Sequence, residues 1–129
     1  MMDRISPAYT YAAELKRVVD GDTLEMRVDL GCYTWVEITV RLLGVNCPET
    51  KGKSRPQGLA ATEATRQWLA SHTDLVVITR KDPKSRVDSF RRYLAIIKGD
   101  NAEGLQEDLA QHLLATHNAI PFMEDAGAP

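Results

Sequence analysis

The feature that most constrains the fold of this chain is a strict alternation of apolar and polar residues in two neighbouring stretches near its start. The apolar positions of the first stretch are Leu24, Met26, Val28 and Leu30, and those of the second are Val36, Ile38, Val40 and Leu42. A period of two residues is typical of a β-strand with one buried face, and Gly31 between the stretches suits a turn. A further strand over 12–20 leads into the turn dipeptide Asp20-Gly21, so the pattern predicts a three-stranded meander.

Two helices are predicted after the meander. Ser54 and Gln57 have the spacing of a capping box and Pro56 suits a first turn, so we expect a helix that runs to about Ala70. Leucines at four-residue spacing predict a second helix that starts near Leu105, with Asn101 as its N-terminal cap.

Two more apolar stretches, 74–80 and 92–98, predict a fourth and a fifth strand. Five strands with a helix between the third and the fourth match the OB-fold, a five-stranded Greek-key barrel. We therefore expect an α+β, mainly β fold: a five-stranded OB-fold barrel with two or three helices. Other five-stranded α+β folds have the same order of elements, so the order by itself leaves them open.

Length and composition set the broad class of the protein. The chain has 129 residues, which suffices for one domain with a buried core but not for two of ordinary size. We expect a single domain over 1–129, with its core at about 12–122. No apolar run approaches the roughly 20 residues of a membrane helix, and the N-terminus lacks the apolar stretch of a signal peptide. These features predict a cytoplasmic protein with reduced cysteines at Cys32 and Cys47 and with its three histidines at the surface.

Charge is distributed unevenly along the sequence. The net charge is only −2, but residues 41–98 carry twelve basic and five acidic groups, whereas the flanking segments are acidic. A localised anion-binding site produces such a basic middle section, and solvated basic loops produce it as well. The charge pattern is therefore only a weak indication of a polyanionic partner.

Three short motifs carry candidate chemistry, and the first is Asp20-Gly21-Asp22-Thr23. Taken alone, this tetrapeptide is most simply a hairpin turn. Asp22, however, shares the parity of Leu24, so its carboxylate is expected to point toward the mouth of the barrel. A carboxylate at such a rim is a natural ligand for a hard cation.

The second motif runs from Arg41 to Thr50 with the sequence RLLGVNCPET. It reads either as a strand that ends in a glycine bend before Pro48, or as a set of side chains that converge on one site. In the second case Arg41 offers two parallel donors to a phosphate, and Glu49 accepts a proton from water.

The third motif is DSFRRYL at 88–94. Arg92 shares the parity of Leu94 and Ile96, which puts a charge on an apolar face unless an anion or a carboxylate meets it. Arg91 has the opposite parity and is expected to be in solvent.

Together and in this order, the three motifs resemble the staphylococcal nuclease (thermonuclease) family over about Val18 to Ile120. The resemblance implies an OB-fold barrel with an active site at its rim, which hydrolyses phosphodiester bonds in DNA and RNA with Ca²⁺. It also implies roles for single residues. The catalytic set would be Arg41 and Arg92, which grip the scissile phosphate, and Glu49, the proposed general base. The metal ligands would be Asp22, Asn46 and the backbone carbonyl of Cys47.

Further nucleic-acid contacts are expected from the basic loops. The residues concerned are Lys51, Lys53 and Lys84, with Phe90 as a candidate for stacking on a base.

Two departures from the family pattern stand out. Asn46 replaces an aspartate and so keeps an oxygen but loses a charge, and Arg91 replaces a glycine.

The sequence thus predicts a calcium-dependent nuclease that acts on single-stranded DNA and RNA or on locally melted duplex, with no membrane contact and no protein partner implied. The alternative, which Asn46 keeps open, is a catalytically weak or inactive module of the same fold that binds single-stranded nucleic acid or a protein. A third interpretation, an unrelated OB-type oligonucleotide binder, would need stacking aromatics on its strands, and only 6% of the residues are aromatic.

Overall fold

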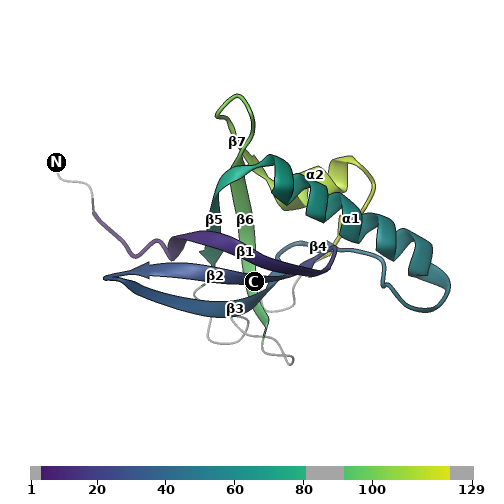
Figure 1. Ribbon diagram of the computed structural model, residues 1–129, viewed down its shortest axis with the longest axis horizontal. Coiled ribbons are helices and arrows are strands. Elements are labelled where there is room, and N and C mark those ends of the chain that lie inside the picture. Colours follow the sequence, from purple (N-terminus) through teal and green to yellow (C-terminus); the bar gives the residue numbers. More distant parts are fainter. Residues whose placement is uncertain (1–3, 81–91, 123–129) are drawn as a thin grey trace.

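In the computed structural model, which describes residues 4–80 and 92–122 (of Arg92, the backbone alone), five strands close into a barrel (Figure 1). The strands are β1 (Thr10–Asp20), β2 (Thr23–Gly31), β3 (Thr34–Leu42), β5 (Thr73–Thr79) and β6 (Arg92–Asp100). Neighbours in the order β3-β2-β1-β5-β6 are antiparallel, and a parallel pairing of β3 with β6 closes the barrel. The prediction of a five-stranded OB-fold barrel with helices is confirmed.

Two helices and several short strands complete the described part of the chain. α1 (Arg55–Ser71) follows the 3₁₀ turn η1 (Gly52–Ser54), and α2 (Leu109–Ala115) follows β7 (Gln106–Asp108), which lies beside β6. β4 (Val45–Asn46) and β8 (Ile120–Pro121) pair with each other in a separate small sheet. The sequence did not predict these short strands, because two or three residues are too few to show a period. No helix within the described ranges is long and apolar enough to cross a membrane.

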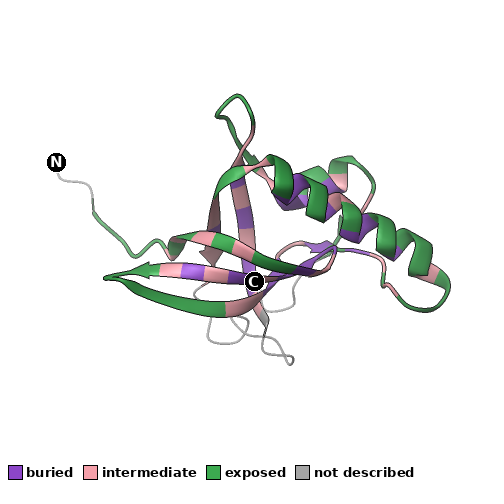
Figure 2. Cartoon of the chain, in the orientation of Figure 1, coloured by how far each residue is buried: buried purple, intermediate pink, exposed green. Residues whose placement is uncertain are grey.

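The alternating residues of β2 and β3 build the core of the barrel. Leu24, Met26 and Val40 expose 0% of their surface, and they pack in one cluster with Val77 and Ile97 from the opposite strands. Burial of each such leucine or methionine side chain stabilises the fold by roughly 1.5–3 kcal/mol. α1 contributes its inner face to the same cluster, as the buried stripe in Figure 2 shows. The members from α1 are Ala61, Trp68 and Leu69.

The outer end of the β2–β3 hairpin departs from the predicted burial. Leu30 and Val36 have the parity of the core residues, yet they are 46% and 38% exposed. The two strands project beyond the closed part of the barrel, where β6 pairs only with Thr39–Leu42 (Figure 2). Parity predicted the face of the sheet correctly, but not where the barrel ends.

Helix α1 begins at the predicted place without the predicted capping box. Ser54 is its N-cap residue, but the hydroxyl donates to the carbonyl oxygens of Glu49 (2.9 Å) and Lys51 (3.2 Å) rather than accepting from a helix amide. Pro56 lies in the first turn, where its missing N–H costs nothing. Ser54 therefore anchors the preceding loop instead of capping the helix.

Helix α2 begins at Leu109, later than the leucine spacing predicted. Its cap is Asp108, whose carboxylate accepts from the amide of Gln111 at 3.2 Å. Leu105 lies before the helix and is 64% exposed. The predicted cap, Asn101, closes a different turn, in which its side-chain oxygen accepts from the amide of Leu105 at 3.0 Å. This helix start was predicted wrongly because an exposed leucine was counted as part of the apolar stripe.

The side chain of His72, which follows α1, is buried rather than at the surface as expected. Its side chain is 7% exposed and stacks on Trp68 with the ring centroids 3.8 Å apart. Nδ1 lies 2.6 Å from the carbonyl oxygen of Trp68, and Nε2 lies 2.7 Å from a carboxylate oxygen of Glu107. Both ring nitrogens therefore lie within hydrogen-bond distance of oxygen atoms that can accept. This contact joins the end of α1 to β7.

The contact makes the stability of the fold depend on pH through Glu107. Hydrogen bonds from His72 and Asn101 hold the pKa of Glu107 below its ordinary value of 4.5. A lowered carboxyl pKa stabilises the folded state above the unfolded pKa, and this contribution is lost as the pH falls through the folded pKa. We predict that Glu107→Gln lowers the free energy of unfolding at neutral pH and leaves it nearly unchanged in acid below the folded pKa, as measured by urea titration.

Glu103→Gln provides the matched control, because Glu103 is an exposed glutamate just ahead of the same short strand. It should leave the free energy of unfolding unchanged at both pH values. An effect of Glu107→Gln of equal size at neutral and acid pH would contradict the assignment.

Candidate active site

A cavity of ≈ 540 Å³ lies where the β1–β2 turn meets the segment between β3 and α1. Its lining consists of Asp20, Asp22, Arg41, Asn46, Cys47, Pro48, Glu49, Thr50 and Lys51. The first two predicted motifs, far apart in the sequence, thus converge on one cavity. Their roles in chemistry remain predictions, but the structure does bring the side chains together.

The register of two strands explains why Asp22 and Arg41 meet. Leu24 pairs with Val40 across the β2–β3 ladder, which places Thr23 opposite Arg41. A shift of one residue would turn every core side chain of β2 out to solvent, so hydrophobic burial fixes this register. The ladder continues one residue before the start of β2, since the amide of Leu42 donates to the carbonyl oxygen of Asp22 at 2.9 Å.

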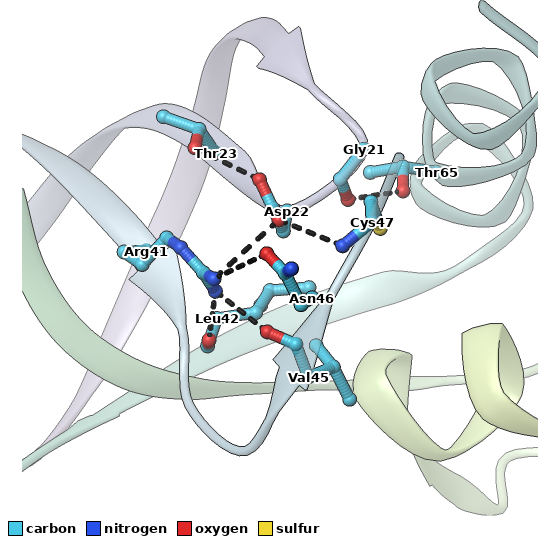
Figure 3. A network of polar contacts seen from close by, with 9 residues as sticks. All are labelled: Gly21, Asp22, Thr23, Arg41, Leu42, Val45, Asn46, Cys47 and Thr65. Carbon is cyan, nitrogen blue, oxygen red and sulfur yellow. Dashed lines mark hydrogen bonds and ion pairs between the residues drawn. The ribbon is translucent and has the colours of Figure 1, made fainter. Parts of the chain in front are cut away.

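Asp22 is only 8% exposed, and several neighbouring groups contact its carboxylate (Figure 3). One oxygen accepts from the hydroxyl of Thr23 at 3.1 Å, and the other accepts from the backbone amide of Cys47 at 2.9 Å. The second oxygen also lies 3.6 Å from Nη2 of Arg41. These contacts satisfy a buried charge that would otherwise be costly, and they fix its orientation.

Arg41 is 9% exposed and holds the turn between β3 and β4. Its Nη1 donates to the carbonyl oxygens of Leu42 (2.7 Å) and Val45 (2.8 Å), and its Nη2 donates to the side-chain oxygen of Asn46 (3.1 Å) (Figure 3). The turn itself depends on Gly44, whose φ of +84° is disfavoured for residues with a side chain. Arg41 therefore has a structural role that the sequence did not indicate.

The loop after β4 is packed tightly against α1. A Cβ atom on Gly58 would collide with the backbone of Glu49, so only glycine permits this approach. The side chain of Glu49 remains exposed at the cavity, as does that of Lys51. Lys53 is exposed on η1, outside the cavity lining. A carboxylate on a rigid loop is suited to accept a proton from a bound water.

The remaining predicted residues lie near the limits of the described structure. Arg92 begins β6 and pairs with Thr39 of β3, two residues from Arg41, but its side chain is outside the described part. Lys84 and Phe90 lie within 81–91, also outside the described residues. Their predicted contacts with nucleic acid stay predictions.

Cys47 contributes its backbone rather than its thiol. Burial, together with the charge of Asp22, raises the pKa of the thiol to about 12, so the sulfur stays protonated and is a poor nucleophile. Neither Cys47 nor the exposed Cys32 is in a disulfide, which agrees with the expected reduced state.

An aromatic residue that sequence reasoning missed lies beside Arg41. The ring of Phe122 has its centroid 5.7 Å from the guanidinium carbon of Arg41, and the residue is 43% exposed. Its amide donates to the carbonyl oxygen of Gly44 at 2.9 Å, next to the pairing of β8 with β4. The sequence around Phe122 gives no signal for this contact, because the contact depends on two-residue strands distant in the chain.

The cavity lining includes oxygen donors of the kinds that a hard divalent cation binds, among them the side chains of Asp20, Asp22 and Asn46. Oxygens of Asp22 and Asn46 lie 3.6 and 3.1 Å from Nη2 of Arg41, so in this structure both face the guanidinium. Carboxylate, amide and carbonyl oxygens are the ligands that Ca²⁺ prefers. Within the described ranges, no cluster of three or more His, Cys, Asp or Glu side chains could hold a metal. A metal site here would therefore need the Asn46 amide and a backbone carbonyl beside the carboxylate.

Comparison with known proteins identifies the family of this chain. A model of the family described as staphylococcal nuclease homologue matches residues 39–126, more than half of the chain. The chain belongs to this family. A search of curated proteins found no match. The part matched by the staphylococcal nuclease model includes Arg41, Asn46 and Glu49, whereas Asp22 precedes it and is placed at the cavity by the fold alone.

The contacts of Arg41 in this nuclease-like site make the fold depend on its guanidinium. In Arg41→Lys, the single ammonium group would leave at least one of the buried carbonyl oxygens of Leu42 and Val45 without its donor, which costs about 1–3 kcal/mol. We predict a loss of this size in the free energy of unfolding, measured by urea titration.

Arg66→Lys serves as the control for this substitution. Arg66 lies on the exposed face of α1, where its side chain is 53% exposed and pairs with Glu63. Its replacement should change stability by no more than about 0.5 kcal/mol. Equal losses for the two variants would show that the contacts of Arg41 add no stability.

Proposed function

We propose that this chain is a calcium-dependent nuclease that hydrolyses phosphodiester bonds in single-stranded DNA and RNA or in locally melted duplex. The observation that carries the proposal is the buried pair of Asp22 and Arg41 at a cavity that also presents the exposed carboxylate of Glu49. Family membership supports a nuclease-like function, and nucleic acids are the general substrates of the family.

In this proposal the guanidinium of Arg41 binds a non-bridging oxygen of the scissile phosphate. Attack on a phosphodiester builds negative charge on a group that is already anionic, so a fixed planar cation lowers the barrier most as that charge develops. The bonds from Arg41 to Leu42 and Val45 hold the guanidinium in place before substrate binds. Arg92, at the start of the neighbouring strand, would supply the second cation.

Glu49 would accept the proton of the attacking water. Its loop is held against α1 by Gly58 and by the hydroxyl of Ser54, so the carboxylate acts from a rigid support. Asp22, Asn46 and the Cys47 carbonyl would hold Ca²⁺, which supplies Lewis-acid charge to the phosphoryl oxygen. Phe122, exposed beside Arg41, offers a face on which a base can stack. Lys51 and Lys53 would contact flanking phosphates.

A second candidate function is binding without cleavage. Asn46 favours it, because the amide brings one unit of charge less to the metal than a carboxylate would, and its oxygen already accepts from Arg41 at 3.1 Å. In that case the module would bind single-stranded nucleic acid or a protein.

The proposal is tested by incubating single-stranded DNA with the protein in excess calcium and in chelator. We predict cleavage with calcium only, and a loss of roughly 100-fold or more in rate for Asp22→Asn and for Glu49→Gln. Glu63→Gln, on the exposed face of α1, is the matched control and should cleave at the wild-type rate. Strand binding without cleavage at any calcium concentration would leave the binding module as the function.

Asn46 gives a separate test of the metal ligands. Because calcium affinity rises with ligand charge, we expect the native chain to bind calcium weakly, at about millimolar concentrations, and Asn46→Asp to bind it more tightly and to cleave faster when calcium is limiting. Calorimetric titration with and without a bound nucleotide measures the affinity. If the substitution changes neither affinity nor rate, residue 46 does not hold the metal.

A further inference from the structure

Thr65 in α1 makes a hydrogen bond that an ordinary helix threonine does not make. Its side chain is completely buried at 0% exposure, and its hydroxyl donates to the carbonyl oxygen of Gly21 at 2.6 Å, across 44 residues of sequence. A helix threonine commonly donates to the carbonyl four residues earlier. Thr62, one turn away and 7% exposed, does so, with Gly58 as acceptor at 2.9 Å. The two threonines therefore form a matched pair with different partners.

The acceptor of Thr65 belongs to the peptide group that directly precedes Asp22. On the other side of Asp22, its own carbonyl oxygen accepts from the amide of Leu42 at 2.9 Å. Both peptide groups that flank the carboxylate are thus held, one by α1 and one by β3. From this held backbone, the side chain of Asp22 points toward Cys47 and Arg41, as seen in Figure 3.

The ladder between β1 and β2 does not fix this turn on its own. The register is irregular between Val18 and Asp20, immediately before the turn. Packing supplies part of what the ladder lacks, since a Cβ atom on Gly21 would lie 2.9 Å from the sulfur of Cys47 and 3.0 Å from Cβ of Ala61. Close packing limits how near the turn approaches α1, and the hydrogen bond from the hydroxyl of Thr65 holds the Gly21 carbonyl oxygen against the helix.

We propose that Thr65 is a positioning residue, whose hydrogen bond to Gly21 sets the orientation of the Asp22 carboxylate and thereby the affinity of the site for a divalent cation. The part that concerns the cation rests on the proposed function. Replacement of a residue that hydrogen-bonds to a metal-ligating residue and orients it typically changes metal affinity 10–100-fold. The sequence shows Thr65 only as one polar residue on the inner face of a helix.

The test compares Thr65→Val, which removes the hydroxyl at nearly constant shape, with Thr65→Ser, which keeps it. Thr62→Val is the control for loss of a buried threonine hydroxyl in the same helix. Calcium affinity is measured by calorimetry on the folded proteins. Thr65→Val should weaken calcium binding about tenfold, whereas Thr65→Ser and Thr62→Val should retain the wild-type affinity.

A second readout needs no metal. The amide of Cys47 donates to Asp22, so its hydrogen exchange reports the position of the carboxylate. In calcium-free protein, Thr65→Val should speed exchange of this amide about tenfold relative to the other loop amides, and Thr65→Ser should not. Thr65→Ala serves in its place if the valine variant does not fold.

The outcomes separate the two ideas. If wild-type protein binds no calcium, the proposed function fails, and the Cys47 amide still decides whether Thr65 positions Asp22. Wild-type exchange at Cys47 in Thr65→Val overturns the positioning role. Altered exchange with unchanged calcium affinity overturns its link to the cation.

Discussion

The buried ion pair of Asp22 and Arg41 is the interaction on which this site depends. Each charge would be expensive to bury alone, and each is satisfied by neighbours from a different part of the chain. Asp22 accepts from Thr23 and Cys47, while Arg41 donates to the carbonyls of its own turn. The pair thus fastens the β1–β2 turn, the β3–β4 turn and the loop before α1 to one another.

The neutral side chain of Asn46 completes this cluster. With an amide at position 46, the charges of Asp22 and Arg41 balance within the contacts that Figure 3 shows. A carboxylate in its place would leave the cluster with an excess negative charge. Asn46→Asp, which favours binding of a cation, would therefore make the stability of the folded protein depend more strongly on a bound cation.

Much of this arrangement could be predicted from the sequence, because it follows from local patterns. The alternation in β2 and β3 gave the barrel strands, and the parity of Asp22 gave its direction toward the cavity. The motif from Arg41 onward offered convergence of its side chains on one site as one of two interpretations, and the family resemblance favoured it; Asn46 and Glu49 do line the same cavity. Each of these inferences depends on neighbours a few residues away, which a sequence displays directly.

Other parts could not be predicted, because they depend on contacts between distant segments. Nothing near Thr65 indicates that its hydroxyl reaches Gly21 rather than its own helix. The burial of His72 depends on β7, and the place of Phe122 depends on the pairing of β8 with β4. Leu105 shows the opposite error, in which a local pattern was present but the tertiary structure did not use it.

The pairing of β8 with β4 has a consequence for how the protein matures. Phe122 lies beside Arg41 next to the pairing of Ile120 and Pro121 with Val45 and Asn46, which joins segments more than half of the chain apart. Chains emerge from the ribosome N-terminus first, so Arg41 is synthesised well before Phe122. The aromatic surroundings of the guanidinium therefore depend on a segment that is made after the strands of the barrel.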